Sequence, residues 1–316
     1  MDRFKKFRNN LNNYMLDHCH SRRNIINTAV EDLIMGGGKR LRPIMFFWAS
    51  KFGQSEEKEL LPIAAGIELL HMATLVHDDI IDEAILRRGE VTAQERFGKN
   101  VAVFVGDFLL TKANDLFSQN LSRHSLKRLN KTISLVCEGE IHQYEEKYIL
   151  DVSINDYLRR IRRKTALLFA VSTYMGGYES GLRSKNLSLL YNFALELGMT
   201  FQIQDDLLDF VGQEEKTGKK MGQDLIAGIY TLPVIYLMQK KDFSAEARSI
   251  LSKDLLDVGD VNIISQRVVE SGALKDSKEL GKKFLDRANN SLHQLPKIKA
   301  REDMMKILKR QLKRQK

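Results

Sequence analysis

The sequence predicts a helical protein that folds as one domain over residues 1–316. The first observation behind this fold class is a nearly uniform apolar stretch from Leu60 to Val76, which only Glu68, His71 and Thr74 interrupt. A helix that is apolar all round must be buried in a larger helical body, and this stretch is too long for a strand. A second apolar stretch, residues 187–210, has the same character.

Composition and length agree with one large core. The chain is 43% apolar, has only four prolines, and contains no Pro/Gly/Ser-rich linker or internal repeat. Its two cysteines provide no disulfide framework, so we expect a reducing, cytoplasmic location. No stretch approaches 18 uninterrupted apolar residues, so we expect no transmembrane segment. The net charge of +9 is scattered and not interleaved with aromatics, which argues against nucleic acid and leaves anionic lipid or phosphorylated small substrates.

A glycine-rich loop, GGGKRLRP, covers residues 36–43 between a first amphipathic helix and the next helix. Such loops cradle phosphate through backbone N–H groups, and Lys39 and Arg42 are spaced to converge on one anion. The spacing is not that of a P-loop, and no strand precedes the loop. The alternative is a helix end followed by solvated basic residues.

The first long helix runs into three aspartates, Asp78, Asp79 and Asp82. At about 100° per residue, Asp78 and Asp82 share one stripe with His71 and Thr74, whereas Asp79 points further round. Carboxylates this close repel one another unless a cation neutralises them, and oxygen ligands without cysteine suit Mg²⁺ shared with substrate phosphates. Taken alone, the cluster is more simply explained as a solvated acidic helix end.

The second apolar helix ends in the same spacing, with Asp205, Asp206 and Asp209 in FQIQDDLLDF. Gln202 lies one turn earlier on the face of Asp205, and Gly198 on that face allows close approach of a neighbour or ligand. Two buried helices that both end in DDxxD predict six carboxylates facing one cavity. Such a cavity could hold several Mg²⁺ ions around a polyphosphate.

Further polar residues are candidates for diphosphate contacts. Arg87 and Arg88 follow the first acidic cluster, and Lys164 and Thr165 lie where a basic run changes into an apolar one. The stretch VGQEEKTGKKMGQD after the second cluster lacks helical periodicity, so we expect a mobile loop that folds Lys219 over bound phosphate.

Five motifs, taken in their order along the chain, resemble those of the trans-isoprenyl diphosphate synthase (polyprenyl synthetase) family over essentially the whole chain. They are GGGKRLRP, HDDIIDEAILRRG, RRKTA, FQIQDDLLDF and TGKKMGQDL. The sequences of these motifs are most similar to those of the larger, catalytic subunit of a two-component bacterial synthase. The resemblance implies an all-α, orthogonal helical bundle of the isoprenoid synthase type around a deep central cavity. It also implies a homodimer, or a heteromer with a small regulatory subunit.

By this resemblance the chain is a Mg²⁺-dependent prenyltransferase that joins isopentenyl diphosphate to an allylic diphosphate, 1'-4 and trans. All six aspartates are assigned to metal, with three Mg²⁺ ions when substrate is bound. The isopentenyl diphosphate site corresponds to Lys39, Arg42, His71 and Arg88, and the allylic side to Arg87, Lys164, Thr165, Gln202 and Lys219. In the family the released diphosphate takes the proton, and we expect peripheral membrane contact at product release.

Product length is predicted from the residues four and five positions before the first DDxxD, which set the cavity floor in the family. Here they are Thr74 and Ala73. Both are small, so we expect a product of roughly six or more isoprene units, with Leu70 or a residue of the next helix as the wall. A short-chain synthase that makes farnesyl or geranylgeranyl diphosphate is the alternative.

Two other functions remain open. A class I terpene cyclase also ionises an allylic diphosphate, but such enzymes normally carry an Asn/Ser/Glu motif in place of the second DDxxD. A non-catalytic subunit of a heteromeric synthase would keep the fold for assembly, and the intact aspartates together with Lys164 argue against it.

Overall fold

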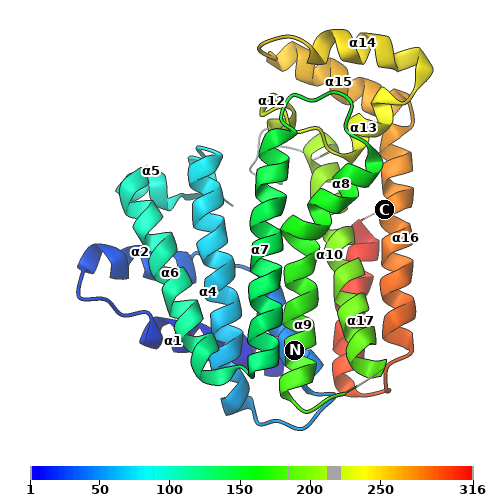
Figure 1. Ribbon diagram of the computed structural model, residues 1–316. Coiled ribbons are helices and arrows are strands. Elements are labelled where there is room, and N and C mark those ends of the chain that lie inside the picture. Colours follow the sequence, from blue (N-terminus) through cyan, green and yellow to red (C-terminus); the bar gives the residue numbers. More distant parts are fainter. Residues whose placement is uncertain (1, 88, 184, 212–221, 315–316) are drawn as a thin grey trace. The chain divides into compact units, whose positions relative to one another are not determined.

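The computed structural model describes residues 2–87, 89–183, 185–211 and 222–314. Within these ranges the protein is helical apart from one short ladder, in which β1 (Leu86–Arg87) pairs antiparallel with β2 (Glu90–Val91). The predicted all-α fold class is confirmed (Figure 1).

The chain forms two compact units that alternate along the sequence. The first comprises Met1–Leu129 and Ser172–Leu187, and the second comprises Asn130–Val171 and Ser188–Lys316. Three helices contribute residues to both units, namely α7 (Arg123–Glu145), α9 (Leu167–Glu179) and α10 (Lys185–Val211). One domain over residues 1–316 stays a prediction.

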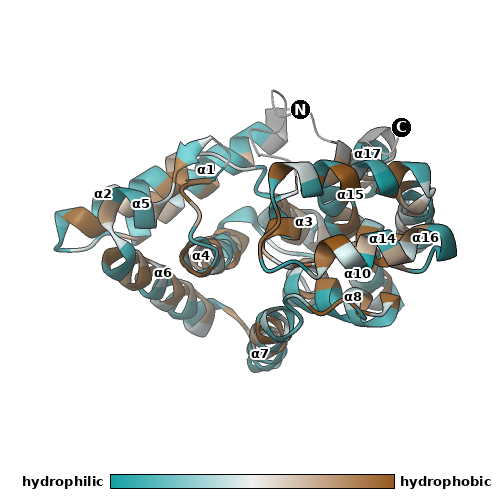
Figure 2. Ribbon diagram, turned by 90° about the horizontal axis from the view of Figure 1, so that it is seen from above, coloured by the Kyte–Doolittle hydropathy of each residue, from teal (hydrophilic) through white to brown (hydrophobic). Residues whose placement is uncertain are grey.

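The first unit is built around one long helix, α4 (Glu57–Ile81). Its other helices are α1 (Asp2–His18), α2 (Asn24–Met35), α3 (Leu41–Ser50), α5 (Ala93–Phe97) and α6 (Lys99–Asn120). Helix α4 packs against α1, α3, α5 and α6, and α6 runs alongside it for most of its length. Figure 2 looks along α4 and shows α1 and α6 on either side of it. Helix α4 is therefore the core of this unit.

Burial explains why α4 is apolar all round. Ile63, Ile67, Leu69 and Val76 are each at most 3% exposed although they lie on different faces of the helix. Burying such a side chain contributes about 1.5–3 kcal/mol. By length and composition α4 could cross a membrane, but 67% of its most apolar window is buried inside the protein. That is the pattern of a core helix.

The second unit packs its helices around α10 and α13 (Leu232–Met238). Its other elements are α8 (Ile154–Ile161), the π-helix η1 (Arg162–Ala166), α12 (Gln223–Ile226), α14 (Lys241–Leu251), α15 (Val258–Glu270), α16 (Ala273–His293) and α17 (Lys299–Arg314). One apolar cluster joins α8, α10 and α13 through residues such as Tyr157, Ile203 and Leu232. A second joins the end of α10 to α13, α14 and α15. The C-terminal half of α10 thus rests on a packed core.

The stretch predicted to be a mobile loop, residues 211–224, is helical at both of its described ends. Residues 212–221 lie outside the described part of the chain. Gly222 donates its backbone N–H to the carbonyl of Asp209 at 3.3 Å, and α12 already begins at Gln223. The missing helical periodicity misled the prediction because one helical turn is too short to show a period.

Candidate active site

The glycine-rich loop turns the chain from α2 into α3. Gly37 and Gly38 have φ of 90° and 128°, which glycine adopts without a steric cost. Arg40 follows with φ of 48° and is only 4% exposed. A left-handed conformation costs a non-glycine residue roughly 1–2 kcal/mol, so the surroundings must hold Arg40 in place.

Three contacts hold the Arg40 guanidinium. Nη1 donates to Glu68 Oε1 at 2.9 Å, Nη2 to the Ile34 carbonyl at 2.5 Å and Nε to Asn12 Oδ1 at 3.2 Å. The Arg40 and Glu68 side chains are 3% and 5% exposed. Glu68, which interrupts the apolar stretch of α4, is therefore the internal counter-ion of this loop. No role was predicted for either residue from the sequence.

Arg42 and His71, both predicted to bind isopentenyl diphosphate, contact each other near Arg40. Arg42 Nη1 lies 2.8 Å from His71 Nε2 across the α3–α4 contact. Because a guanidinium can only donate, Nε2 accepts and the proton of the neutral ring lies on Nδ1. Lys39 is exposed on the loop, one residue before Arg40. Arg88 lies outside the described residues.

The three aspartates at the end of α4 have different surroundings. Asp78 is half-buried and Asp82 is exposed, whereas Asp79 is 5% exposed. Asp79 Oδ1 lies 2.6 Å from Arg87 Nε in an ion pair with β1. Asp79 was predicted to point further round the helix than Asp78 and Asp82. In the structure its carboxylate accordingly points into the protein.

Gln94 fixes the chain that follows α4 and was not predicted from the sequence. Its amide nitrogen donates to the carbonyls of Asp79 at 2.7 Å and Ala84 at 2.9 Å. The Asp79 carbonyl belongs to the last turn of α4, where intrahelical donors are lacking, and Ala84 lies in the turn that follows the helix. No local pattern marks Gln94, because its partners lie 15 and 10 residues away.

The second acidic cluster divides in the same way. Asp205 is exposed and Asp209 is half-buried, whereas Asp206 is 4% exposed. Asp206 accepts from Gln202 Nε2 at 2.9 Å through Oδ1, and from the Tyr157 hydroxyl at 2.6 Å through Oδ2. In both clusters, then, the second aspartate is the internal one.

Burial and charge change the titration of this internal carboxyl. Burial, and after it the nearby carboxylate of Asp224, raises the pKa of Asp206 to about 7. Burial also raises the pKa of the Tyr157 hydroxyl, which therefore stays protonated and donates to Asp206. Asp224 lies in α12 and interacts with Asp206 of the second cluster, and no role was predicted for it from the sequence.

The π-helix η1 presents Lys164 and Thr165, the two residues predicted at the step from basic to apolar sequence. Single π-turns inside longer helices are frequent at functional sites. Thr165 Oγ1 donates to Gln202 Oε1 at 2.7 Å, and Lys164 Nζ lies 2.8 Å from Glu140 Oε2. Three residues predicted for the allylic side, Lys164, Thr165 and Gln202, thus lie on adjoining elements of the second unit. Lys219 lies outside the described residues.

Gly198 makes the approach of η1 to α10 possible. A Cβ atom built on Gly198 would lie 2.7 Å from the Cα of Ala166 in η1. Close approach was predicted for this glycine, and its neighbour is Ala166. The approach brings Thr165 within reach of Gln202.

The residues predicted to set product length lie in the middle of α4. Leu70 and Ala73 are both 2% exposed. Thr74 is half-buried, and its hydroxyl donates to the carbonyl of His71 at 2.8 Å. The polar group of Thr74 is therefore satisfied within its own helix.

The acidic clusters suit magnesium held partly by substrate. Among the described residues, no three His, Cys, Asp or Glu side chains converge closely enough to hold a metal by themselves. Mg²⁺ usually takes one or two carboxylates and completes its shell with water and phosphate oxygens. The negative end of a helix disfavours a carboxylate by about 0.3–1 kcal/mol, so acidic ends on both α4 and α10 favour a cation.

The family of the chain follows from its match to a family model. Residues 23–268 match the model described as polyprenyl synthetase. The chain belongs to the polyprenyl synthetase family. It is therefore a prenyltransferase, and the resemblance stated from its motifs is confirmed.

Individual relatives agree with this assignment. The heptaprenyl diphosphate synthase component 2 of Geobacillus stearothermophilus is 38% identical over 273 residues, which cover 86% of this chain and 85% of the relative. A geranylgeranyl pyrophosphate synthase from Lactobacillus brevis superposes with a TM-score of 0.92 at 29% identity, covering 98% and 97% of the two chains. A polyprenyl synthase from Caulobacter crescentus, solved with calcium and isoprenyl diphosphate, gives 0.90 at 32% identity and covers 96% and 93%.

Proposed function

We propose that this family member condenses isopentenyl diphosphate with an allylic diphosphate, 1'-4 and trans, to give a medium- or long-chain polyprenyl diphosphate. One observation carries the proposal. Helices α4 and α10 end in the same acidic pattern, and in each the second aspartate is buried while the first and last are more accessible. Each helix thus presents an i, i+4 pair of carboxylates on one face.

We restrict the proposed metal ligands to Asp78, Asp82, Asp205 and Asp209. Asp79 and Asp206 are buried against other partners and are assigned to structure. The metal is proposed to be Mg²⁺, three ions with substrate bound, and the calcium complex of the Caulobacter crescentus relative supports a hard divalent cation. When bound, Mg²⁺ draws charge from the diphosphate leaving group.

The residues of the chain have separate tasks in this reaction. Lys39 and the Arg42–His71 pair hold the diphosphate of isopentenyl diphosphate. Lys164, with Thr165 and Gln202, contacts the allylic diphosphate while its C–O bond breaks. Cations placed where negative charge develops lower the barrier. The isopentenyl double bond then forms the new C–C bond to the allylic carbon, and the released diphosphate takes the proton. The roles predicted for Arg87, Arg88 and Lys219 stay predictions.

The direct test is elongation by the purified chain. The protein is incubated with Mg²⁺, farnesyl diphosphate and isopentenyl diphosphate, and the dephosphorylated products are separated by chromatography. We expect products longer than the primer. A cyclised hydrocarbon would indicate a terpene cyclase. Absence of any product, even with a small regulatory subunit added, would indicate a non-catalytic subunit.

Product length is proposed to depend on the middle of α4. We expect Ala73→Phe to shorten the products, because an aromatic ring would fill the floor on which the growing chain rests. Since Ala73 is only 2% exposed, the larger side chain will also cost roughly 1–3 kcal/mol of stability. Thr74→Phe, at a half-buried position, is the parallel variant. Unchanged product length in both folded variants would contradict this assignment.

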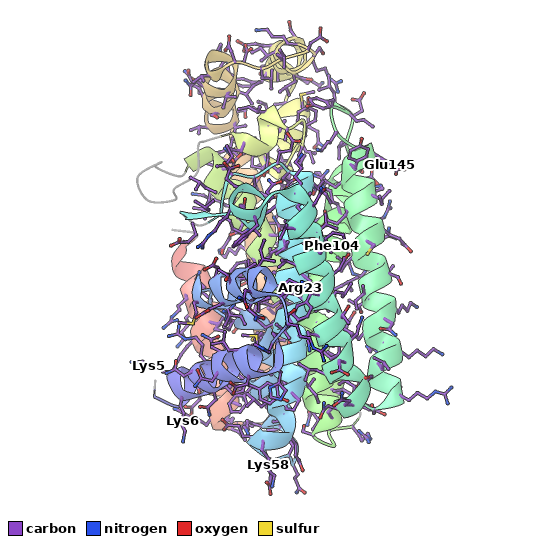
Figure 3. All side chains as sticks on the ribbon, turned by 90° about the vertical axis from the view of Figure 1, so that its left-hand side faces the viewer. Lys5, Lys6, Arg23, Lys58, Phe104 and Glu145 are labelled. Atoms are coloured by element: carbon purple, nitrogen blue, oxygen red, sulfur yellow. The ribbon has the colours of Figure 1, made fainter. Side chains whose placement is uncertain are left out.

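The assembly and location of the chain are further proposals. The name of the Geobacillus stearothermophilus relative, component 2, supports a heteromer with a small subunit, and a homodimer is the alternative. On α6, Phe104 is 66% and Val103 38% exposed. Phe104 is labelled in Figure 3. Exposed apolar side chains of this size support a contact with a second chain. We also propose a cytoplasmic location, with peripheral membrane contact at product release.

A further inference from the structure

Tyr157 is a buried tyrosine in α8 that neither the motifs nor the proposed mechanism includes. Its side chain is fully buried, and its hydroxyl donates to Asp206 Oδ2 at 2.6 Å. The two residues are 49 positions apart and lie on different helices. A buried phenol normally finds one hydrogen-bond partner, and here that partner belongs to the second acidic cluster.

The contact continues as a chain of three hydrogen bonds. Tyr157 donates to Oδ2 of Asp206, and Gln202 Nε2 donates to Oδ1 of the same carboxylate at 2.9 Å. Gln202 Oε1 then accepts from Thr165 at 2.7 Å. The amide of Gln202 therefore turns its nitrogen to Asp206 and its oxygen to Thr165. Both ends of the Gln202 side chain are therefore fixed.

The other groups near Tyr157 are already engaged. Arg160 lies 5.6 Å from the centre of the Tyr157 ring, but its guanidinium bonds to Glu146 and to the carbonyl of Tyr230. Among the described residues, the Asp206 carboxylate accepts hydrogen bonds from Tyr157 and Gln202. Removing the hydroxyl would leave one carboxylate oxygen in a dry site without its donor, and Asp206 would shift or rotate to recover one.

We propose that Tyr157 is a positioning residue for the allylic diphosphate, acting through Asp206 on Gln202 and Thr165. The inference rests on the proposed function, because Gln202 and Thr165 are assigned there to the allylic side. Tyr157 itself touches no substrate. Its hydroxyl sets the angle at which the Gln202 amide and the Thr165 hydroxyl are presented.

The test compares Tyr157→Phe with Tyr230→Phe. Tyr230 is a matched control because it is also buried in the second unit, and its hydroxyl donates to the Leu251 carbonyl in α14 at 3.3 Å. kcat and KM are measured separately for each substrate at saturating Mg²⁺. Binding of a non-ionising allylic thiolodiphosphate is measured by calorimetry, and melting temperatures are recorded for both variants.

We expect Tyr157→Phe to raise KM and Kd for the allylic ligand roughly three- to tenfold and to leave KM for isopentenyl diphosphate unchanged. Tyr230→Phe should lower the melting temperature without this split. In a Gln202→Ala background, Tyr157→Phe should cause no further loss of allylic affinity, because the residue through which it acts is gone.

Three results would overturn the inference. They are equal effects of Tyr157→Phe on both substrates, kinetics identical to those of Tyr230→Phe, and an increased Mg²⁺ requirement with unchanged allylic affinity. A wild-type protein that does not elongate would instead refute the proposed function, so the two failures are distinguishable.

Discussion

At the scale of single residues, the two DDxxD clusters contain two kinds of aspartate. Asp79 pairs with Arg87, and Asp206 accepts from Tyr157 and Gln202. Their neighbours Asp78 and Asp205 are more accessible to a ligand. The sequence predicted that Asp79 points further round than Asp78, because that follows from helical geometry. It did not predict the buried partners, because they come from other parts of the chain.

The difference between Asp78 and Asp79 can be measured with two matched variants. Asp78→Asn should lower turnover by about 10²–10³-fold and raise the Mg²⁺ concentration for half-maximal rate, because an electrostatic stabiliser of the leaving group is lost. Asp79→Asn should instead lower the free energy of unfolding by about 1–3 kcal/mol, because the pair with Arg87 is lost. Turnover is measured at several Mg²⁺ concentrations, and stability by urea titration. Equal losses of turnover with unchanged stability would make Asp79 a ligand.

The buried Arg40–Glu68 pair gives a second prediction at this scale. Glu68→Gln leaves a buried guanidinium without its counter-ion, so the free energy of unfolding should fall by about 3–5 kcal/mol. KM for isopentenyl diphosphate should rise in the folded variant, because Lys39 and Arg42 flank Arg40. The control is Glu302→Gln, which removes an exposed pair with Lys299 and should cost less than about 1 kcal/mol. Similar losses in the two variants, measured in urea, would refute the anchoring role of Arg40.

At the scale of elements, the long helices could be predicted from the sequence, whereas the π-helix η1 could not. The apolar stretch from Leu60 and the one ending at Phe210 lie within α4 and α10, because full burial leaves a pattern along the sequence. The π-helix η1 left no such pattern, since it is only five residues long and its hydrogen bonds span one residue more than those of an α-helix. Its contacts with Gln202 and Gly198 depend on packing between distant segments.

The contact between η1 and α10 makes Gly198 sensitive to substitution. Gly198→Ala would place a methyl group 2.7 Å from the Cα of Ala166, so the helices must separate. We expect a loss of about 1–3 kcal/mol in the free energy of unfolding, together with weaker allylic binding. In Gly259→Ala the nearest atom, at 3.0 Å, is the side-chain oxygen of Asp257, so that variant should lose less. Both are measured in urea. An unchanged or higher stability of Gly198→Ala would contradict the close packing.

At the scale of the whole molecule, the all-α class and the family could be predicted because five motifs occur in order along one chain. The division into two compact units could not, because each unit takes residues from two separate stretches of sequence. Local periodicity carries no information on such pairing. The shared cavity implied by the resemblance stays a prediction for the same reason.

Assembly is the prediction that belongs to this scale. We expect the mass in solution to exceed that of one 36.3 kDa chain. Phe104→Glu should shift the mass toward a single chain, because a charge at an apolar contact is costly to bury. Leu255→Glu, at a side chain that is 87% exposed, is the control and should leave the mass unchanged. The masses are measured by light scattering, and an unaltered mass for Phe104→Glu would exclude this helix face from the contact.

The buried aspartates Asp79 and Asp206 also affect how fast and how tightly the acidic clusters bind a cation. A flexible acidic helix end would lose conformational entropy each time an ion arrives. With Asp79 held by Arg87, and Asp206 held by Tyr157 and Gln202, much of that ordering is completed during folding. The proposed metal ligands are therefore preorganised, so that binding of a cation does not require the backbone around them to change. They are Asp78, Asp82, Asp205 and Asp209.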